Sequence, residues 1–400
     1  MSNWRASYDS LSEVIRSGAY VNLALGKLDE KDRAFVTQVV NGVLENYFEL
    51  DSIIKATSPK APQAAIRVLL LQAIYALRYM KEPEYAVVNE HVKLAEELGK
   101  EALKGYVNAV LKKVANGNYE FPPESDPRYE EIKYKLPTWL INIVKKNYPE
   151  DYDKILFSEK KREPHIRLGR ALRPAQFEQK AGTFEKTKTG YYVTNTPFIK
   201  RAYNSGKLTY QSYTSTMVVD AMGNVKGKTV LDLCAAPGGK SVYLAEKGAI
   251  VTACDIHQHR LALIKSYSDR MKTDFKIYLN DATKFRSDWS KDFDAVLVDV
   301  PCSGIGVISK RRDIIFKKSM KEIKVLVELQ TRILDVAAMY VKRGGMLVYS
   351  TCSILKEENN DVIANFIQTH PVYVVDYEKQ YLPSSDGTDG FYVARLIRRA

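Results

Sequence analysis

The spacing of hydrophobic residues changes along the chain, from a helical pattern in the first part to alternating strand and helix patterns in the last. Up to about residue 118, apolar side chains recur at the spacing of amphipathic helices. The range 64–79 is almost wholly apolar and predicts a buried central helix, and ranges 86–98 and 102–114 predict two more. Asp29 is the expected N-cap of an earlier helix. The apolar face of that helix comprises Val36, Val40, Val43, Leu44 and Tyr47. We therefore expect an all-α N-terminal domain with its own core.

From about residue 206 onward, short apolar runs rich in β-branched residues alternate with amphipathic segments. The runs predict strands at 229–234, 250–256, 275–279, 293–300 and 345–350. The intervening segments predict helices at 240–246, 260–271, 320–341 and 359–369. This alternation is typical of an α/β domain with a doubly wound, mostly parallel sheet. A last extended run, 391–397, predicts an added edge strand.

A proline-rich stretch, 121–127, is the clearest linker in the chain. After it, Thr138 is expected to cap a helix that runs to about residue 148, whereas 150–210 is basic and only weakly periodic. We therefore expect three parts: an all-α domain at 1–122, a small basic connecting subdomain at 128–205 and the α/β domain at 206–400. The fold of the connecting part does not follow from its pattern.

The composition narrows the class of protein. No apolar run approaches the roughly 18 residues that a membrane span requires, and the first residues lack a signal-peptide pattern, so we expect a cytoplasmic protein. The net charge is +12, and residues 151–250 carry 17 basic against 9 acidic side chains. Such clustering favours a polyanionic substrate over an ordinary solvated surface. The four cysteines form no C-x-x-C pair, which argues against a zinc site or a disulfide framework.

Two cysteines, Cys302 and Cys352, each follow the end of a predicted parallel strand. A single free cysteine is more often a buried core residue than a nucleophile. Two at equivalent strand ends, each among Ser, Thr or Gly, favour chemistry, because ligands bind beyond the carboxyl ends of parallel strands. If the two strands are neighbours, their ends lie about 5 Å apart and both thiols face one crevice.

A loop of small residues follows the first predicted strand and opens a helix. Its residues are Cys234, Ala235, Ala236, Pro237, Gly238, Gly239 and Lys240. Small side chains let a ligand approach the backbone, and the helix N-terminus offers free N–H groups. Asp255 ends the second strand, where it can hold a ribose, and Asp281 follows the third, near the place of an adenine. Together these features favour an adenosine-bearing cofactor that lacks a pyrophosphate.

Three motifs resemble those of the RsmB (Sun/Fmu) family of bacterial RNA cytosine-5 methyltransferases. They are the segments 231–240, 299–304 and 349–353, and the segments 357–359 and 389–392 also fit. The helical N-terminal part resembles the NusB-like domain of the ribosomal members. One departure is Arg312, which stands before Asp313 and Ile314 where the family often has proline. A second is Val300, which replaces a common alanine.

The resemblance implies a multidomain protein with a NusB-like domain and a Rossmann-like methyltransferase domain, with S-adenosylmethionine as methyl donor and no metal. It implies a single-stranded or flipped cytosine of small-subunit (16S) ribosomal RNA as substrate, and we expect a monomer. It places the cofactor on the 234–240 loop, with Asp255 at the ribose, Asp281 at the adenine and Asp299 near both the methionine end and the base. It makes Cys352 the nucleophile and Cys302 the residue that helps to release the product.

The chemistry explains why two thiols would be needed. Cytosine C5 is a poor nucleophile until the Cys352 thiolate adds to C6, and a hydrogen bond at N3, for which Asp299 is the candidate, would stabilise the resulting charge. Cys302 suits the removal of the C5 proton. Because the sequence is nearly symmetric between the two cysteines, this assignment is a hypothesis. Asp232 is a further expected cofactor contact, whereas the Cys234 and Cys254 thiols are expected to be structural.

Other functions remain possible from the residues alone. A DNA cytosine-5 methyltransferase would need neither the second strand-end cysteine nor the helical domain, and an adenine-amino methyltransferase would carry a Pro-Pro-aromatic loop. A cytosine-5 methyltransferase of another RNA, such as tRNA, and a non-enzymatic ribosome-assembly factor are further alternatives. Cations after the Cys302 loop are expected to contact RNA phosphates, although a solvated loop is the alternative. They are Lys310, Arg311, Arg312, Lys317 and Lys318.

Overall fold

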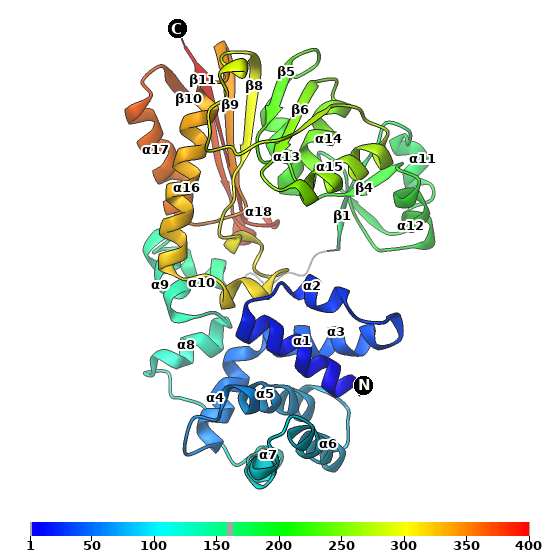
Figure 1. The fold of residues 1–400 in the computed structure, drawn as a ribbon, viewed down its shortest axis with the longest axis vertical. Coiled ribbons are helices and arrows are strands. Elements are labelled where there is room, and N and C mark those ends of the chain that lie inside the picture. Colours follow the sequence, from blue (N-terminus) through cyan, green and yellow to red (C-terminus); the bar gives the residue numbers. More distant parts are fainter. Residues whose placement is uncertain (1, 158–162, 400) are drawn as a thin grey trace. The chain divides into compact units, whose positions relative to one another are not determined.

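A computed structural model describes residues 2–157 and 163–399 of the chain (Figure 1). The chain forms two compact units, a helical unit of residues 1–157 with 308–319, and a sheet unit of residues 158–307 with 320–400. The range 128–205 expected to form one connecting subdomain is thus divided between the two units. No helix within the described residues is long and apolar enough to cross a membrane.

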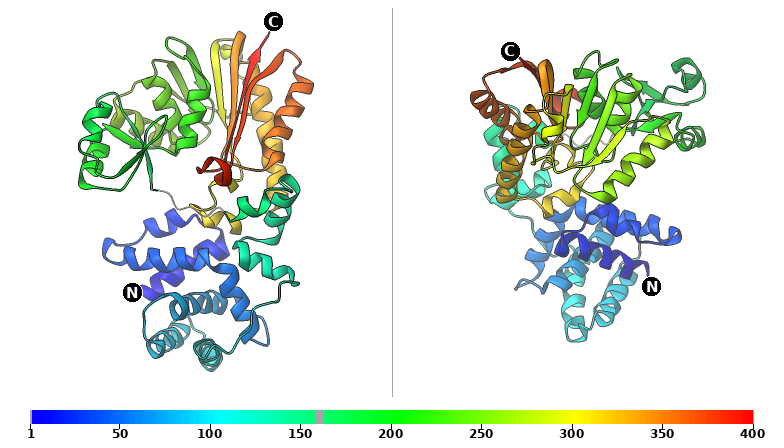
Figure 2. Two further views of the ribbon diagram at one scale, coloured as in Figure 1. Left: turned by 180° about the vertical axis from the view of Figure 1, so that it is seen from behind. Right: turned by 45° about the horizontal axis from the view of Figure 1, so that its top comes forward.

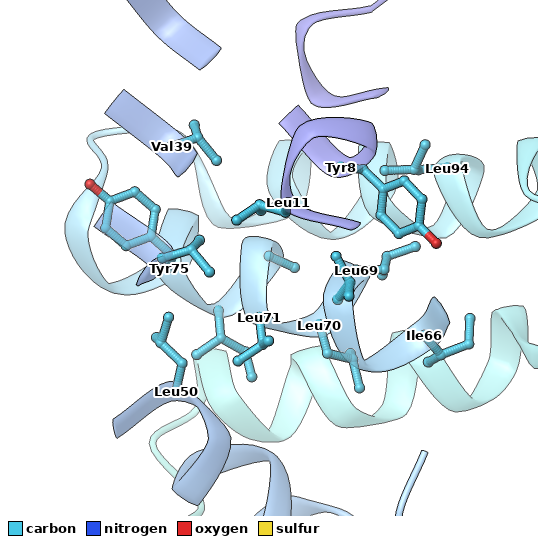
Figure 3. Close-up of a cluster of buried hydrophobic side chains, with 14 of the residues drawn as sticks. Tyr8, Leu11, Val39, Leu50, Ile66, Leu69, Leu70, Leu71, Tyr75 and Leu94 are labelled. Carbon is cyan, nitrogen blue, oxygen red and sulfur yellow. The ribbon is translucent and has the colours of Figure 1, made fainter. Parts of the chain in front are cut away.

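The helical unit is built around α5 (Ala64–Tyr79), the predicted central helix. Leu69, Leu70 and Leu71 of this helix are fully buried among side chains of α1, α3 and α4 (Figure 3). Helices α3 and α5 pack so closely that a Cβ at Gly42 would lie 2.0 Å from the Tyr75 ring, so α3 needs glycine at this position. The remaining helices of the unit are α1 (Asn3–Ser17), α2 (Val21–Gly26), α3 (Glu30–Glu45), α4 (Tyr47–Thr57), α6 (Glu84–Glu97), η1 (Glu101–Leu103), α7 (Lys104–Ala115), α8 (Pro127–Tyr134), α9 (Thr138–Asn147), α10 (Tyr152–Leu156) and η4 (Arg312–Phe316).

Two expected helix caps differ in detail. Asp29 is the N-cap residue of α3, but its side chain makes no capping hydrogen bond. Pro137, not Thr138, is the N-cap of α9, and both Thr138 N and its hydroxyl donate to Glu131 Oε1, at 2.9 and 2.7 Å. The Glu131 carboxylate therefore accepts the N–H hydrogen bond at the start of α9 that a capping side chain would otherwise accept.

The segment 308–319 leaves the sheet unit and packs on the helices of the helical unit. The Phe316 ring meets Tyr47 edge to face, with centroids 4.8 Å apart. Lys317 Nζ lies 3.0 Å from the centre of the Tyr20 ring and 3.6 Å from the buried carboxylate of Asp313. Burial lowers the pKa of Lys317, and its side chain is only 13% exposed. The Lys317 side chain is thus largely buried within the unit, and the expected phosphate contacts of these cations stay a prediction.

The sheet unit contains a seven-stranded sheet in the order β10-β11-β9-β8-β5-β6-β7. The five strands from β9 to β7 pair in parallel, and β11 pairs antiparallel with both β9 and β10. The predicted all-α domain and doubly wound, mostly parallel sheet are thus confirmed. The strands are β5 (Thr229–Asp232), β6 (Ile250–Asp255), β7 (Lys276–Leu279), β8 (Phe293–Asp299), β9 (Val341–Thr351), β10 (Tyr373–Tyr381) and β11 (Phe391–Arg398).

The prediction of β11 as an edge strand is wrong, because β10 covers its outer side. Along β10, Val374, Val375 and most of the polar side chains are at least partly exposed, as fits an edge. By contrast, β11 is mostly buried, since it lies between two partners.

Helices cover both faces of this sheet, and alternate residues of one strand serve the two cores (Figures 1 and 2). Val296 and Val298 of β8 pack with α16 and α17, whereas Ala295 and Leu297 pack with α13, α14 and α15. The helices of this unit are α13 (Tyr213–Ala221), α14 (Gly239–Glu246), α15 (Gln258–Met271), α16 (Met320–Ala338), α17 (Asn360–Thr369) and α18 (Pro383–Asp386), with η2 (Ser287–Trp289), η3 (Ile305–Val307) and η5 (Lys356–Glu358).

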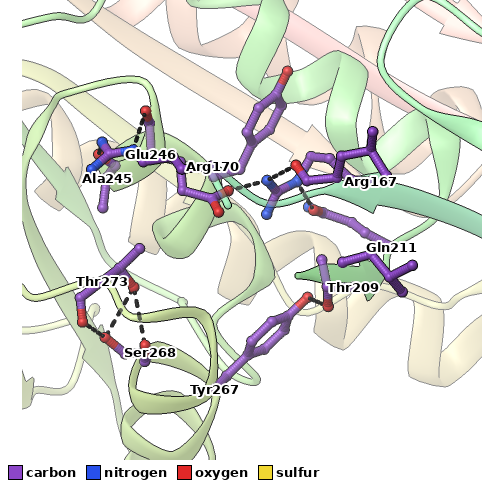
Figure 4. A network of polar contacts seen from close by, with 12 residues as sticks. Arg167, Arg170, Thr209, Gln211, Ala245, Glu246, Tyr267, Ser268 and Thr273 are labelled. Atoms are coloured by element: carbon purple, nitrogen blue, oxygen red, sulfur yellow. Dashed lines mark hydrogen bonds and ion pairs between the residues drawn. The ribbon is translucent and has the colours of Figure 1, made fainter. Parts of the chain in front are cut away.

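A small antiparallel sheet in the order β2-β3-β1-β4 precedes the large one in the sheet unit. It encloses its own core around Ile166, Phe177 and Val193. A polar network joins it to the large domain (Figure 4). There Arg167 of β1 forms a buried ion pair with Glu246 of α14, and Arg170 donates to the carbonyl oxygens of Ala245 and Glu246. The elements are β1 (His165–Leu168), α11 (Pro174–Glu178), β2 (Phe184–Lys186), β3 (Tyr191–Val193), α12 (Pro197–Asn204) and β4 (Leu208–Tyr210).

Removing one partner of the Arg167–Glu246 pair should destabilise the sheet unit strongly. The two side chains are only 3% and 6% exposed, so Arg167→Met would leave a buried carboxylate without its cation. We expect Arg167→Met to lower the free energy of unfolding by about 3–5 kcal/mol, measured by urea denaturation. The double variant Arg167→Met/Glu246→Leu, which removes both charges, should lose much less. Equal losses in the two variants would contradict this account.

Candidate active site

The two cysteines singled out in the sequence lie together at the carboxyl edge of the large sheet. β8 and β9 are parallel neighbours, with Asp299 opposite Ser350, and the loops that carry Cys302 and Cys352 follow. The two Sγ atoms are 3.0 Å apart, and both residues are partly exposed. The condition on which a shared crevice depended, that these two strands are neighbours, is therefore met. A planar ring entering from solvent could therefore meet both sulfurs.

The surroundings of Cys302 favour the protonated form of its thiol. The hydrogen bond with Cys352, together with burial, raises the pKa of Cys302 well above its usual value. The backbone N–H of Cys352 also donates to Cys302 Sγ at 3.3 Å. Cys302 therefore keeps its proton at pH 7 in the free protein.

Asp299 lies beside the cysteines at the end of β8. One carboxylate oxygen accepts from Ser350 Oγ at 2.7 Å and the other from Lys240 Nζ at 2.6 Å. Lys240 comes from the N-terminal turn of α14, and its Nζ lies 5.4 Å from the centre of the Phe391 ring. These contacts fix the direction of the Asp299 carboxylate. The sequence indicated Asp299 and Lys240 but gave no sign that Ser350 would hold the same group.

A cavity of about 200 Å³ adjoins this carboxylate. Seven of the residues selected from the sequence line it: Cys234, Ala235, Ala236, Pro237, Gly239, Lys240 and Asp299. The rest of the lining includes five residues that did not follow from the sequence: Tyr210, Gln211, Ser212, Ser215 and Tyr267. Gly238 has a φ of +107°, and a Cβ there would lie 3.2 Å from Ile264 Cα, so this turn requires glycine. The cavity can therefore receive a ligand along the loop backbone.

Asp232 is the one carboxylate that lines this cavity with an oxygen left unpaired among the described residues. Its Oδ2 accepts from Ser241 at 2.6 Å, whereas the buried Oδ1 has no hydrogen-bond partner. Burial raises the pKa of Asp232 to about 7. A positively charged ligand would compensate for this burial, because an opposite charge nearby favours the ionised carboxylate. The residues present therefore fit a cationic ligand that carries a small polar group.

Asp255 and Asp281 do not line the cavity. Asp255 ends β6, where its Oδ1 accepts from His257 N at 3.0 Å. Asp281 follows the neighbouring strand β7 and accepts from Thr283 Oγ1 at 2.7 Å and Thr283 N at 3.0 Å. These bonds lower the pKa of Asp281. Both acids lie at adjacent strand ends, so their assignment to ribose and adenine stays a prediction.

The remaining cysteines and histidines show no reactive features. Burial raises the pKa of both Cys234 and Cys254, which keeps them as neutral thiols. The rings of His257 and His259 stack on each other with centroids 5.5 Å apart. Within the described part of the chain, no group of three or more His, Cys, Asp or Glu side chains could hold a metal ion.

Behind the two cysteine loops lies a polar network that the sequence analysis did not interpret. Its centre is Glu358, which is fully buried and accepts hydrogen bonds from Ser303, Ser353 and Gln330. The Glu357-Glu358-Asn359 motif was noted only as part of a resemblance. Gln330 lies in the middle of α16, where its position carries no local signal.

Comparisons with known proteins cover up to 98% of the chain. The family model described as 16S rRNA methyltransferase RsmB/F matches residues 220–397, and that of the NusB family matches residues 5–116. The probable ribosomal RNA small subunit methyltransferase B of Bacillus subtilis (strain 168) is 30% identical over 436 residues, which cover 98% of this chain and 97% of that protein. Ribosomal RNA small subunit methyltransferase B of Proteus mirabilis is 29% identical with the same coverage.

Two solved structures share the fold. The structure of PH0851 has a TM-score of 0.81 at 24% identity and covers 98% of both chains. That of NSun6 from Pyrococcus horikoshii with SFG has a TM-score of 0.57 at 18% identity and covers 66% of this chain and 99% of that one.

The raised pKa of Asp232 should appear in the pH dependence of stability. Between its usual value of 3.8 and about 7, the folded protein keeps a proton that the unfolded chain has released. The free energy of unfolding should therefore fall with rising pH across this window, by about 4 kcal/mol relative to Asp232→Asn. Urea denaturation of both proteins at steps from pH 4 to 8 measures the difference. If the difference in the free energy of unfolding between the two proteins stays constant over that range, the pKa of Asp232 is not raised in the folded protein.

Proposed function

Because the chain belongs to the RsmB/F family of 16S ribosomal RNA methyltransferases, we propose that it transfers a methyl group from S-adenosylmethionine to C5 of a cytosine in small-subunit ribosomal RNA. The observation that carries this proposal is the pair of sulfur atoms 3.0 Å apart, at neighbouring strand ends beside the loop cavity. A single nucleophilic thiol would not need a second one at that distance.

The 234–240 loop and Asp232 are proposed to hold the cofactor, which supplies an electrophilic methyl group when bound. Asp232 would lie near its positive charge, and ionisation of this carboxyl on binding would release a proton. Asp255 and Asp281 are proposed for the ribose and adenine. Lys240 and Asp299 link this loop to the base, because their ion pair spans from α14 to the end of β8.

Cys352 is proposed to begin the reaction by bonding its thiolate sulfur to C6 of the cytosine. This addition moves the electrons of the 5,6 double bond toward C5 and N3. A proton donated at N3 would stabilise this charge, and Asp299, held by Lys240 and Ser350, is the residue proposed to carry that proton. C5 then becomes nucleophilic enough to take the methyl group. The target base must leave its stack to reach the two sulfurs, so an unpaired or flipped nucleotide is expected.

Cys302 is proposed to complete the reaction. The neighbouring Cys352 contributes to its raised pKa, and that contribution ends once the Cys352 sulfur is bonded to carbon. Cys302 can then lose its proton to solvent and, as a thiolate, accept the C5 proton. The C5–H electrons re-form the 5,6 double bond, and the C6–S bond breaks to release the Cys352 thiolate. The carbon–sulfur bond at Cys352 thus removes one of the causes that hold the proton on Cys302.

Replacement of each cysteine tests this division of roles. Cys302→Ala should accumulate a covalent RNA–protein adduct in the presence of S-adenosylmethionine, because the product cannot be released, whereas Cys352→Ala should form none. Denaturing gel electrophoresis with labelled 16S ribosomal RNA measures the adduct. An adduct with Cys352→Ala but none with Cys302→Ala would reverse the assignment. Transfer RNA and duplex DNA serve as alternative substrates, and bisulfite sequencing of ribosomal RNA from a strain without the protein locates the cytosine.

Cofactor binding separates an enzyme from an assembly factor that has only the fold. We expect S-adenosylmethionine at 100 times its Kd to stabilise the protein by about 2.7 kcal/mol, seen as a rise in the melting temperature. Asp232→Asn should weaken this effect, because it removes the carboxylate beside the positive charge. S-adenosylmethionine that leaves the melting temperature unchanged would favour the assembly factor.

A further inference from the structure

The Glu358 carboxylate is buried completely and receives four hydrogen bonds. Oε1 accepts from Ser303 N at 2.8 Å and from Gln330 Nε2 at 2.9 Å. Oε2 accepts from Ser303 Oγ at 2.5 Å and from Ser353 Oγ at 2.6 Å. Among the described residues, no Lys or Arg forms an ion pair with it, so these neutral donors alone compensate the buried group.

Three of these four donors belong to the two cysteine loops, and the fourth belongs to Gln330 of α16. Ser303 follows Cys302 in the chain, and Ser353 follows Cys352, so one carboxylate joins the residue after each thiol. Gln330 reinforces the first loop, because its Nε2 also donates to Pro301 O at 3.0 Å. The loops are also joined directly: Ser303 Oγ donates to Ser353 Oγ at 3.2 Å, Gly306 N donates to Cys352 O at 3.0 Å, and Cys352 N donates to Cys302 Sγ at 3.3 Å.

We propose that Glu358 is a positioning residue that sets the separation of Cys302 and Cys352, so that the C5 proton is within reach of Cys302 once Cys352 is bonded to C6. This inference rests on the proposed function and deepens it. A carboxylate suits the task because it only accepts hydrogen bonds, and all four groups around it donate. A glutamine amide would offer one accepting oxygen, and its NH₂ group would face donors instead of acceptors.

A competing role for Glu358 is general stability of the domain, which any buried hydrogen-bonded acid supplies. Asp294 offers a control for the loss of a hydrogen-bonded acid in the same unit, although its side chain is 35% exposed and paired with Lys342. It lies near the amino end of β8, away from the cysteines, and accepts from Thr229 N and Thr229 Oγ1, both at 2.8 Å, and from Lys342 Nζ at 3.0 Å. Loss of Asp294 should destabilise the domain without moving the thiols.

The separation of the thiols can be measured without RNA or cofactor, by thiol–disulfide exchange with oxidised glutathione. The two thiols and one glutathione disulfide give a Cys302–Cys352 disulfide and two molecules of reduced glutathione. The two protein sulfurs are oxidised, and the glutathione sulfurs take the two electrons and two protons. Mass spectrometry of the cross-linked peptides gives the equilibrium constant.

We expect Glu358→Ala to lower this equilibrium constant about tenfold, since hydrogen bonds to a charged group are lost from both loops. Glu358→Gln should stay within about threefold of the wild type, because one oxygen still serves the Ser303 N–H. Asp294→Ala should leave the constant unchanged. If Glu358→Ala does not fold, Ser303→Ala, which removes one donor, should lower it about threefold. An unchanged or increased constant in the folded variants would overturn the proposal.

A second measurement separates positioning from the function on which it rests. With RNA and S-adenosylmethionine, Glu358→Ala should accumulate the covalent adduct and turn over more slowly with an unchanged KM for RNA, because only release depends on Cys302. Glu358→Gln should restore release. A general loss of stability would lower every step alike and leave no adduct. If Cys302→Ala itself forms no adduct, the proposed function fails, whereas the glutathione equilibrium still decides the role of Glu358.

Discussion

The parallel pairing of β8 with β9 is the constraint on which the site depends. It sets Asp299 opposite Ser350 and brings two loops from residues 50 positions apart to one edge of the sheet. Strand pairing alone does not fix the side chains and the loops beyond the strand ends. Hydrogen bonds do so, because Ser350 donates to Asp299 and both loops donate to Glu358. Backbone geometry thus brings the thiols near one another, and a buried carboxylate behind them links the two loops.

Three carboxylates near this edge differ because their surroundings differ. Asp232 is buried with one unpaired oxygen and has a raised pKa, whereas Asp299 has a lysine and a serine on its oxygens. Glu358 is equally buried but is satisfied by four donors. Burial without partners leaves a group ready for a ligand, and burial with partners makes a group structural. The same residue class therefore serves binding, orientation and support.

The small sheet contributes to the cavity beside the 234–240 loop through its attachment to the large domain. Tyr210 and Gln211, at the end of β4, form part of the cavity wall, and Gln211 also accepts from the Arg167 guanidinium. That guanidinium forms the ion pair with Glu246 (Figure 4). The end of a region whose fold was not evident from the sequence therefore supplies two of the residues that line the cavity.

The sequence by itself determined that an all-α part precedes an α/β part, and it determined the strand and helix periods, the strand-end thiols and the loop of small residues, because these depend on local patterns and on short motifs. It did not determine that the expected connecting part, 128–205, is divided between two units. It did not determine β10, whose half-exposed residues lack a clear alternation, so β11 was expected at the edge. It also did not reveal the roles of Gln330, Glu358 and Tyr267, since each acts through neighbours distant in the chain. Only tertiary packing decides such contacts, because burial and hydrogen-bond partners are properties of the folded chain and not of a local segment.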